Sequence, residues 1–326
     1  MVLPVLTGVR AGIQTALLIA KQSAKGVLAT NFTTADSTRV WSETPMVDFG
    51  RRKSRPGPWM TSTRSEATGG RYGLSKLQEG TITTKCTPKV LELFLRSNWG
   101  PYAAGVFALG TQIAEWYTLA WLEKAENDDH KLVRIRDVFF HRLTLLVRPL
   151  QAVLIRADYA GIEPVEADAP VAGVTLPAML ANNPTPADTN VFAAQDVQFR
   201  RDPAGANVSL VYHNLDVTLD QRVLAKYWMT SGPTVYKGGK TNVTVDYRSK
   251  AADETWPLLQ NAMNGTKETF RMLATAPSPV KTLTIDMPEL DFEFEPIGHN
   301  GVTYTELAGH GQSHESGAVF ASISLV

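Results

Sequence analysis

The segment from Lys240 to Phe294 constrains the fold most, because the spacing of its apolar residues changes along its length. Its first part alternates, which is the period of a half-buried strand; one side carries Thr241, Val243, Val245 and Tyr247. Residues Ala251 to Asn264 then predict a helix, with Trp256, Leu259, Ala262 and Met263 on one apolar face. Gly265 is suited to end this helix, because glycine adopts the left-handed conformation at little cost. Two further strands are predicted at Glu268 to Ala274 and Val280 to Phe294.

The same order of elements occurs about 165 residues earlier in the chain. A Thr-rich strand is predicted at Gly80 to Cys86. A helix follows at Thr87 to Asn98, with Pro88 in its first turn, where the missing N–H costs little. Gly100 follows this helix as Gly265 follows the other, and alternating segments come next at Glu115 to Glu123 and Lys131 to Ile155. Few side chains coincide, so the repeat is one of element order and spacing.

The repeat predicts a duplicated β-rich unit and divides the 326 residues into two domains of ordinary size. We place the first domain at residues 1–165, a linker at 166–190 and the second domain at 191–326. The linker belongs to a stretch from Glu163 to Asn190 that is rich in Pro, Ala and Asn and has no clear period. The remaining segments predict strands at 191–199 and 208–219, a short helix or continued strand at 221–230, a turn at 232–239, a Gly- and His-rich loop at 298–317 and a closing strand at 319–325.

Composition excludes several classes of protein. Lys plus Arg (32) equals Asp plus Glu (32), whereas a general nucleic-acid binder would carry a basic excess. Zero net charge also weakens self-repulsion, which suits a protein that associates. The single Cys86 excludes an internal disulfide. No apolar run has the length of a membrane span or a secretion signal, so we expect a protein that is made in the cytosol and has no membrane partner.

Two groups of charged residues are candidate functional sites. The first is a basic cluster in the Gly-, Arg- and Pro-rich loop 46–71, formed by Arg51, Arg52, Lys53, Arg55 and Trp59. It fits a solvated loop, a contact with another subunit, since Arg and Trp are enriched at interface hot spots, or a contact with DNA. The second is an acidic stripe on alternate positions, formed by Asp291, Glu293 and Glu295. It fits either the solvent face of a sheet or a negative wall that keeps DNA from adhering as it passes.

Motifs for catalysis or metal binding are not convincing. Gly239-Lys240-Thr241 resembles the end of a phosphate-binding loop, but position 234 is Thr and a strand, not a helix, is predicted to follow. His310 and His314 have the spacing of zinc ligands on a helix, yet the glycines around them disfavour a helix. No Ser, His and Asp arrangement is evident, and Cys86 lacks the context of a nucleophile. We therefore expect no enzyme activity, no cofactor and no metal.

Four segments, taken in order, resemble a family of phage proteins: Ala20 to Thr30 (AKQSAKGVLAT), the strand and helix at 80–100, the strand, helix and strand at 241–273, and the late strands and loop at 281–311. In this order the chain is similar to siphophage tail tube proteins, of the class with two tube-type domains per subunit. The likeness covers nearly the whole chain and depends on the order of loose motifs. The loop 46–71 is less typical of the family.

The resemblance implies a mainly β fold: two tandem tail-tube-like domains, each a β-sandwich or split barrel with one short helix, that contribute hairpins to an oligomeric β-barrel. It implies a non-enzymatic major tail tube subunit of the virion, made in the bacterial host cytoplasm. Such subunits form stacked rings, and a duplicated subunit would form a trimer with pseudo-sixfold symmetry. The implied partners are further copies of the chain, a tape-measure protein in the lumen, tail terminator and distal tail proteins at the ends, and phage DNA in transit. The loops 46–71 and 298–317 are then candidates for contacts between rings.

Two other classes fit parts of the same pattern. A tail-terminator or baseplate ring component would form one closed ring that does not polymerise. A carbohydrate-binding β-sandwich would be a monomer with exposed aromatic residues such as Trp59, Trp228 or Trp256, although Trp256 is predicted on the apolar face of a helix. The sequence leaves open the host, a contractile sheath, the copy number of the ring and the hairpins that line the lumen.

Overall fold

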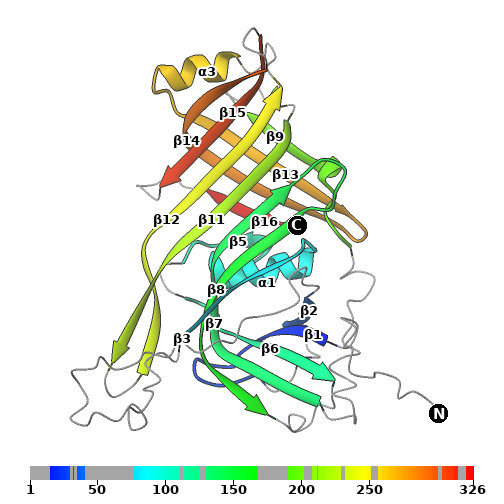
Figure 1. The fold of residues 1–326 in the computed structure, drawn as a ribbon, viewed down its shortest axis with the longest axis vertical. Helices are drawn as coiled ribbons and strands as arrows, with labels where there is room; N and C mark the ends of the chain where they lie inside the picture. The colour runs from blue at the N-terminus through cyan, green and yellow to red at the C-terminus, as the bar shows by residue number, and fades with distance from the viewer. Residues whose placement is uncertain are drawn as a thin grey trace, which may run out of the picture.

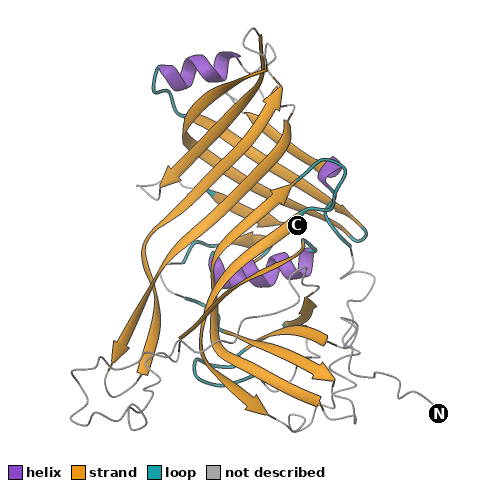
Figure 2. Cartoon of the chain, in the orientation of Figure 1, coloured by secondary structure: helices purple, strands orange, loops and turns teal. Residues whose placement is uncertain are grey.

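The fold comes from a computed structural model that describes residues 15–29, 32, 35–40, 77–110, 113–124, 130–167, 190–201, 208–210, 212–228, 232–250, 256–299, 303–314 and 321–326. Within these residues the protein is mainly β, as predicted, and its strands connect into one large antiparallel network. Figures 1 and 2 show long tilted strands in the upper part, shorter strands below and helix α1 between them.

The first half of the chain forms a six-strand array in the order β2-β1-β6-β7-β8-β3. All neighbours in it are antiparallel. Its elements are β1 (Thr15–Lys21), β2 (Ser37–Val40), β3 (Leu77–Lys85), α1 (Pro88–Asn98), β4 (Tyr102–Ala103), β5 (Val106–Phe107), β6 (Tyr117–Lys124), β7 (His130–Val147) and β8 (Leu154–Ala167).

The second half repeats this pairing in the order β10-β9-β13-β14-β15-β12, and β11 is added beside β12. Its elements are a 3-10 turn η4 (Ala194–Asp196), β9 (Val197–Arg201), β10 (Val208–Ser209), β11 (Tyr212–Trp228), β12 (Gly232–Lys250), α3 (Trp256–Met263), β13 (Glu268–Pro277), β14 (Val280–His299), β15 (Thr303–His314) and β16 (Ser322–Leu325). In both halves a strand leads into a helix, three long strands follow, and the last of them returns to pair with the strand before the helix; in the first half the short strands β4 and β5 lie between the helix and the long strands.

The two halves also share a β-bulge at the same place. In the first half Tyr117 is opposite Val138, but Leu119 is opposite Ile135, so β7 holds one extra residue. In the second half Glu268 is opposite Leu290 and Phe270 is opposite Met287, so β14 holds one extra residue as well. The inserted positions have positive φ, 52° at Asp137 and 62° at Glu289. A bulge bends a strand and increases its twist. Strands β7 and β14 therefore bend at matching points in the two halves.

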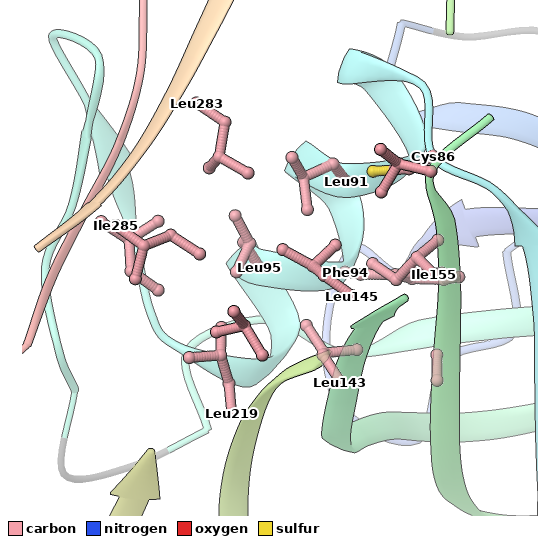
Figure 3. Packing of buried hydrophobic residues seen from close by; sticks show 14 of the residues in the cluster. Cys86, Leu91, Phe94, Leu95, Leu143, Leu145, Ile155, Leu219, Leu283 and Ile285 are labelled. Carbon is pink, nitrogen blue, oxygen red and sulfur yellow. The ribbon is translucent and has the colours of Figure 1, made fainter. Parts of the chain in front are cut away.

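Helix α1 lies at the centre of the core. Thr87 caps it by accepting a hydrogen bond from the Val90 N–H at 3.3 Å, and Pro88 occupies its first turn, as predicted. Its end needs a glycine, because a Cβ at Gly100 would lie 2.0 Å from the Ala108 carbonyl oxygen. Figure 3 shows its side chains between residues of both halves; those labelled include Leu91, Phe94 and Leu95 of α1, Leu143 and Leu145 of β7, and Leu283 and Ile285 of β14.

The two halves are further joined by strand pairing. Residues Leu215 to Asp220 of β11 pair with Arg142 to Val147 of β7. Strand β16, at the end of the chain, pairs with β14 and with β5. The halves thus share one sheet network and one core, while the boundaries proposed for two domains and a linker stay a prediction.

The predicted helix and strand at 251–274 are confirmed where the structure describes them, and Gly265 ends α3 with a φ of +66°. Its N–H bonds to the Ala262 carbonyl at 3.0 Å. The predicted apolar face of this helix is wrong at one residue, because Met263 is 80% exposed. The side chain of Trp256 and residues 251–255 lie outside the described part.

Three segments predicted without a strand are in fact strands. Residues 232–239 belong to β12. Gly238 and Gly239 do not form a turn; they lie where the register of β12 shifts relative to β11. Thr303 to His314 form β15, whose glycines lie on its buried side. Strand β8 continues through Glu166 and Ala167 into the predicted linker. Conversely, the single alternating run at 131–155 divides into β7 and β8 around a turn.

Candidate functional site

A polar sheet face extends across β14, β15, β12, β11 and β7, whose strands pair in that order (Figure 1). The opposite face is buried and apolar, with Leu215, Val217 and Leu219 from β11 and Val243 and Val245 from β12. Because side chains alternate between the faces of a strand, the intervening residues form rows across the polar face. One row follows the register Glu293, His310, Asp246 and Asp216, and a second follows Asp291, Gln312, Thr244, Thr218 and Thr144.

The acidic stripe lies on this face as far as the structure describes it. The side chains of Asp291 and Glu293 are exposed on β14. The backbone of Glu295 pairs with Ala308 in the same strand, and its side chain lies outside the described residues. The stripe therefore borders a broader polar surface. Whether it faces solvent or a lumen stays a prediction.

Sequence reasoning missed the residues that lie opposite this stripe because they come from other strands. His310, which is opposite Glu293 in register, bonds through its Nδ1 to the Asp246 carboxylate at 2.5 Å. The alternation of Gly309 and Gly311 with His310 and Gln312 was the available signal, but the glycines favoured a loop. Within the described residues, no group of three His, Cys, Asp or Glu side chains could hold a metal ion.

A shallow groove of about 620 Å³ opens at one end of the polar face. Both signs of charge line it, with Arg148 and Arg248 beside Asp216, Asp246 and Glu293. Arg148 and Asp216 form two parallel contacts, one of them from Nη2 to Oδ2 at 2.9 Å. This hydrogen bonding raises the pKa of the Arg148 guanidinium. Asp216 is thus engaged by Arg148, and Asp246 by His310, so two of the carboxylates in the groove already have partners.

The part of the polar face contributed by the first half is also internally paired. Thr81 of β3 donates to Asp158 of β8 at 2.6 Å, and Arg156 lies 3.6 Å from the same carboxylate. Thr144 of β7 and Thr218 of β11 share a hydrogen bond of 3.0 Å across the junction of the two halves. The polar face is thus continuous across the two halves of the chain.

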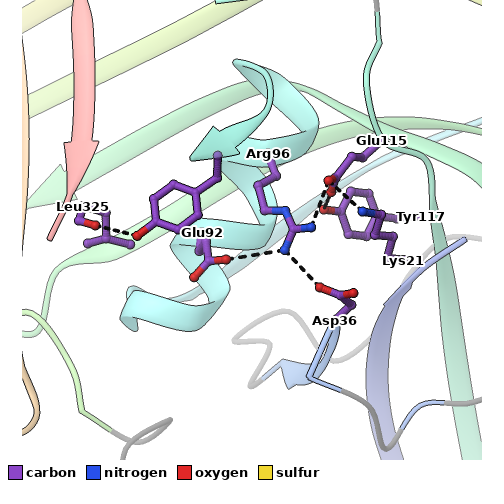
Figure 4. A network of polar contacts seen from close by, with 8 residues as sticks. Lys21, Asp36, Glu92, Arg96, Glu115, Tyr117 and Leu325 are labelled. Atoms are coloured by element: carbon purple, nitrogen blue, oxygen red, sulfur yellow. Dashed lines mark hydrogen bonds and ion pairs between the residues drawn. The ribbon is translucent and has the colours of Figure 1, made fainter. Parts of the chain in front are cut away.

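A polar network fixes α1 to the strands beside it (Figure 4). Arg96 donates to Glu115 at 2.9 Å and to Asp36 at 3.0 Å, and Lys21 and Tyr117 donate to Glu115 at 2.8 and 2.7 Å. Burial alone would raise the pKa of Glu115, but hydrogen bonds from Arg96, Lys21 and Tyr117 hold that pKa below its ordinary value. Burial also raises the pKa of Tyr117 well above its ordinary range. These groups are held for structure, since each has a partner and none adjoins the polar groove.

The second half has a counterpart of this network. Arg201, the last residue of β9, donates to Glu268 at 2.9 and 2.7 Å, and Asn261 of α3 contacts the same carboxylate. In the first half, Lys21 at the end of β1 and Arg96 of α1 meet Glu115, which lies two residues before β6. In the second half, Arg201 at the end of β9 and Asn261 of α3 meet Glu268, the first residue of β13. The networks add a chemical likeness to the repeated topology.

One strand edge is left open beside the polar face. From Asp291 to His299, β14 pairs with β15, and no other described strand pairs with this segment. Strand β3, at the opposite end of the sheet, pairs only with β8 within the described residues. Unpaired backbone N–H and C=O groups along an edge can accept another strand.

The basic cluster of Arg51, Arg52, Lys53, Arg55 and Trp59 falls outside the described residues, so its role stays a prediction. In the part of the chain that the structure describes, no helix is long and apolar enough to cross a membrane. Comparison with known proteins gives no further assignment: no protein-family model and no curated protein matches this chain.

Proposed function

We propose that this chain is the major tail tube subunit of a bacteriophage and that it acts by assembly into stacked rings. The observation that carries the proposal is the repeated strand order, with its bulge and its Glu-centred network in both halves. A subunit with two equivalent units can contribute two equivalent segments to a ring. Three copies would then supply six units around a common axis.

The junction between the two halves favours a ring over an arrangement of separate domains. Strand β11, next to β12 in the second half, pairs with β7 of the first half, so the two polar surfaces form one face. A head-to-tail contact between copies forms a ring when its rotation closes. Closure would also cover the open edges of the sheet, as in other closed β architectures.

The polar face is suited to line the conduit. Its rows are hydrophilic, two of its basic side chains, Arg148 and Arg156, lie beside carboxylates, and Asp291 and Glu293 are exposed. Phosphate groups bind proteins through Lys and Arg, and the exposed carboxylates of Asp291 and Glu293 would oppose such binding at the β14 end of this face. In this proposal the tape-measure protein occupies the lumen before infection and DNA passes through it during infection, while terminator and distal tail proteins contact the ends.

A tail-terminator or baseplate ring is the second candidate, since the same repeated topology would also suit one closed ring. Negative-stain electron microscopy of the purified chain across a concentration series separates the two. Hollow tubes with a regular axial repeat are the expected result, and their rotational symmetry gives the copy number. Single rings that never stack would favour the second candidate, and monomers at every concentration, even with an added tail initiator complex, would contradict both.

A further inference from the structure

The junction between β7 and β11 inside one chain indicates where two chains meet. Beyond its bulge at Asp137, β7 has two neighbours: β8 lies on one edge, and Leu215 to Asp220 of β11 cover the other edge at Arg142 to Val147. Strand β14 has the same bulge at Glu289. Beyond it, β15 covers one edge, but no described strand covers the other.

The equivalent segment of β14 can be assigned by position. The paired part of β7 begins at Arg142, five residues after Asp137. Between Phe140 and Arg142, β7 holds one further extra residue relative to β8, whereas β14 pairs with β15 without a shift from Asp291 to Ile297. Arg142 therefore matches Glu293, four residues after Glu289, and the segment that matches Arg142 to Val147 is Glu293 to Gly298. We propose that this edge of β14 binds a second copy of the same chain, which adds an antiparallel strand from the β3 end of its sheet, in the register of the β7 and β11 junction.

A second copy is favoured over an unrelated partner because the chain already contains one such junction. The edge of β7 is covered by β11, which lies beside β12 at the end of the second half. The corresponding surfaces lie at the two ends of the sheet, at the edge of β14 and at the edge of β3. An edge at β14 and an edge at β3 are different surfaces, so the contact is head-to-tail and can close into a ring. The inference rests on the proposed self-assembly and adds the edge and the register at which copies meet.

Pro296 gives the polarity of this edge. Proline has no N–H and occurs in sheets where its nitrogen faces away from the neighbouring strand. Pro296 is opposite Leu307 of β15, so its nitrogen is placed on the open edge. Alternate residues present their backbone groups to the same edge, and the Phe294 N–H therefore faces outward too. A proline on an edge also limits non-specific strand addition, so the edge would accept a strand only in a register that does not need the missing donor.

Hydrogen–deuterium exchange with mass spectrometry tests the inference on the unmodified chain, at concentrations where it is dissociated and where it is assembled. Amides of the peptide 291–299 should exchange roughly tenfold more slowly in the assembled form, because exchange then requires opening of the new strand pair. The matched internal control is the peptide 142–147, which is already paired by β11 and should be protected in both forms.

A variant pair gives an independent measurement by sedimentation velocity. Phe294→Pro removes the outward N–H and should abolish assembly, whereas Phe294→Ala shortens the side chain, keeps the N–H and should still assemble. Ser209→Pro, on the edge strand β10 at the other end of the network, should also assemble. Equal loss of assembly in Phe294→Pro and Phe294→Ala would overturn strand pairing as the mode of contact.

The outcomes separate this inference from the proposed function. Single rings with a protected 291–299 peptide would support the edge and contradict the tube. Tubes in which this peptide is unprotected would overturn the edge and leave the tube standing. A chain that stays monomeric at all concentrations, with or without an initiator, would overturn the edge.

Discussion

Arg201 and Glu268 illustrate how much a single buried ion pair can matter for the stability of this protein. Their side chains are 8% and 5% exposed, and they form two parallel hydrogen bonds where β9, β13 and α3 meet. Removing one partner of a buried pair is costly, because the other charge is left without compensation. The pair Lys267 and Glu289 offers a contrast, since both side chains are about half exposed and the atoms are 3.6 Å apart.

These two pairs give a residue-level prediction. Glu268→Gln should lower the free energy of unfolding by about 3 kcal/mol, whereas Glu289→Gln should change it by less than about 0.5 kcal/mol because a solvated pair contributes little. Urea unfolding followed by circular dichroism measures both. Similar values for the two variants would show that the Arg201 network does not stabilise the second half.

The polar network beside helix α1 predicts that the stability of the fold depends on pH. Hydrogen bonds from Arg96, Lys21 and Tyr117 lower the pKa of Glu115 in the folded state, against the opposing effect of burial. The unfolded chain then binds a proton more readily than the folded chain as the pH falls. The contribution of Glu115 is present above its ordinary pKa of 4.5 and is lost as the pH falls through the lower value of the folded state.

The prediction at the element scale is that Glu115→Gln is less stable than the wild type at pH 7 and that the difference narrows toward pH 3. Thermal unfolding across this range measures it. Glu92→Gln is a suitable control, because it removes another carboxylate beside Arg96, at 3.4 Å, and keeps Glu115. A constant difference between Glu115→Gln and the wild type across the range would contradict the role of this carboxylate.

Elements whose signals are local could be predicted from the sequence. Helix α1 has its Thr87 cap and Pro88, α3 ends at Gly265, and the alternating strands β3, β13 and β14 stand out. Glycine-containing strands were missed, because a glycine that lies at a register shift or on a buried face has the same local signature as one in a turn. The bulges at Asp137 and Glu289, and the residues opposite the acidic stripe, depend on pairings between distant strands, which no local pattern specifies.

At the scale of the whole molecule, the decisive property is how charge is distributed on the polar face. The total charge of the chain is zero, but its charges are not evenly spread. Arg148 is paired with Asp216, whereas Asp291 and Glu293 are exposed at the β14 end. A ring built from this surface would therefore present a negative rim to its lumen, which opposes the adhesion of DNA.

Changing the sign of this rim tests the assignment. A variant with Lys at 291, 293 and 295 should fold with nearly unchanged stability, because Asp291 and Glu293 are exposed. Its assemblies should retain short duplex DNA at low salt and release it as salt rises, whereas the wild type should not retain it. The neutral variant Asp291→Asn, Glu293→Gln, Glu295→Gln should retain an intermediate amount of DNA. It therefore separates the loss of repulsion from the gain of attraction.

In a phage that carries the Lys variant, DNA delivery should fall while tails still form. Equal DNA retention by wild-type and Lys assemblies, or normal infectivity of that phage, would mean that this face does not line the conduit.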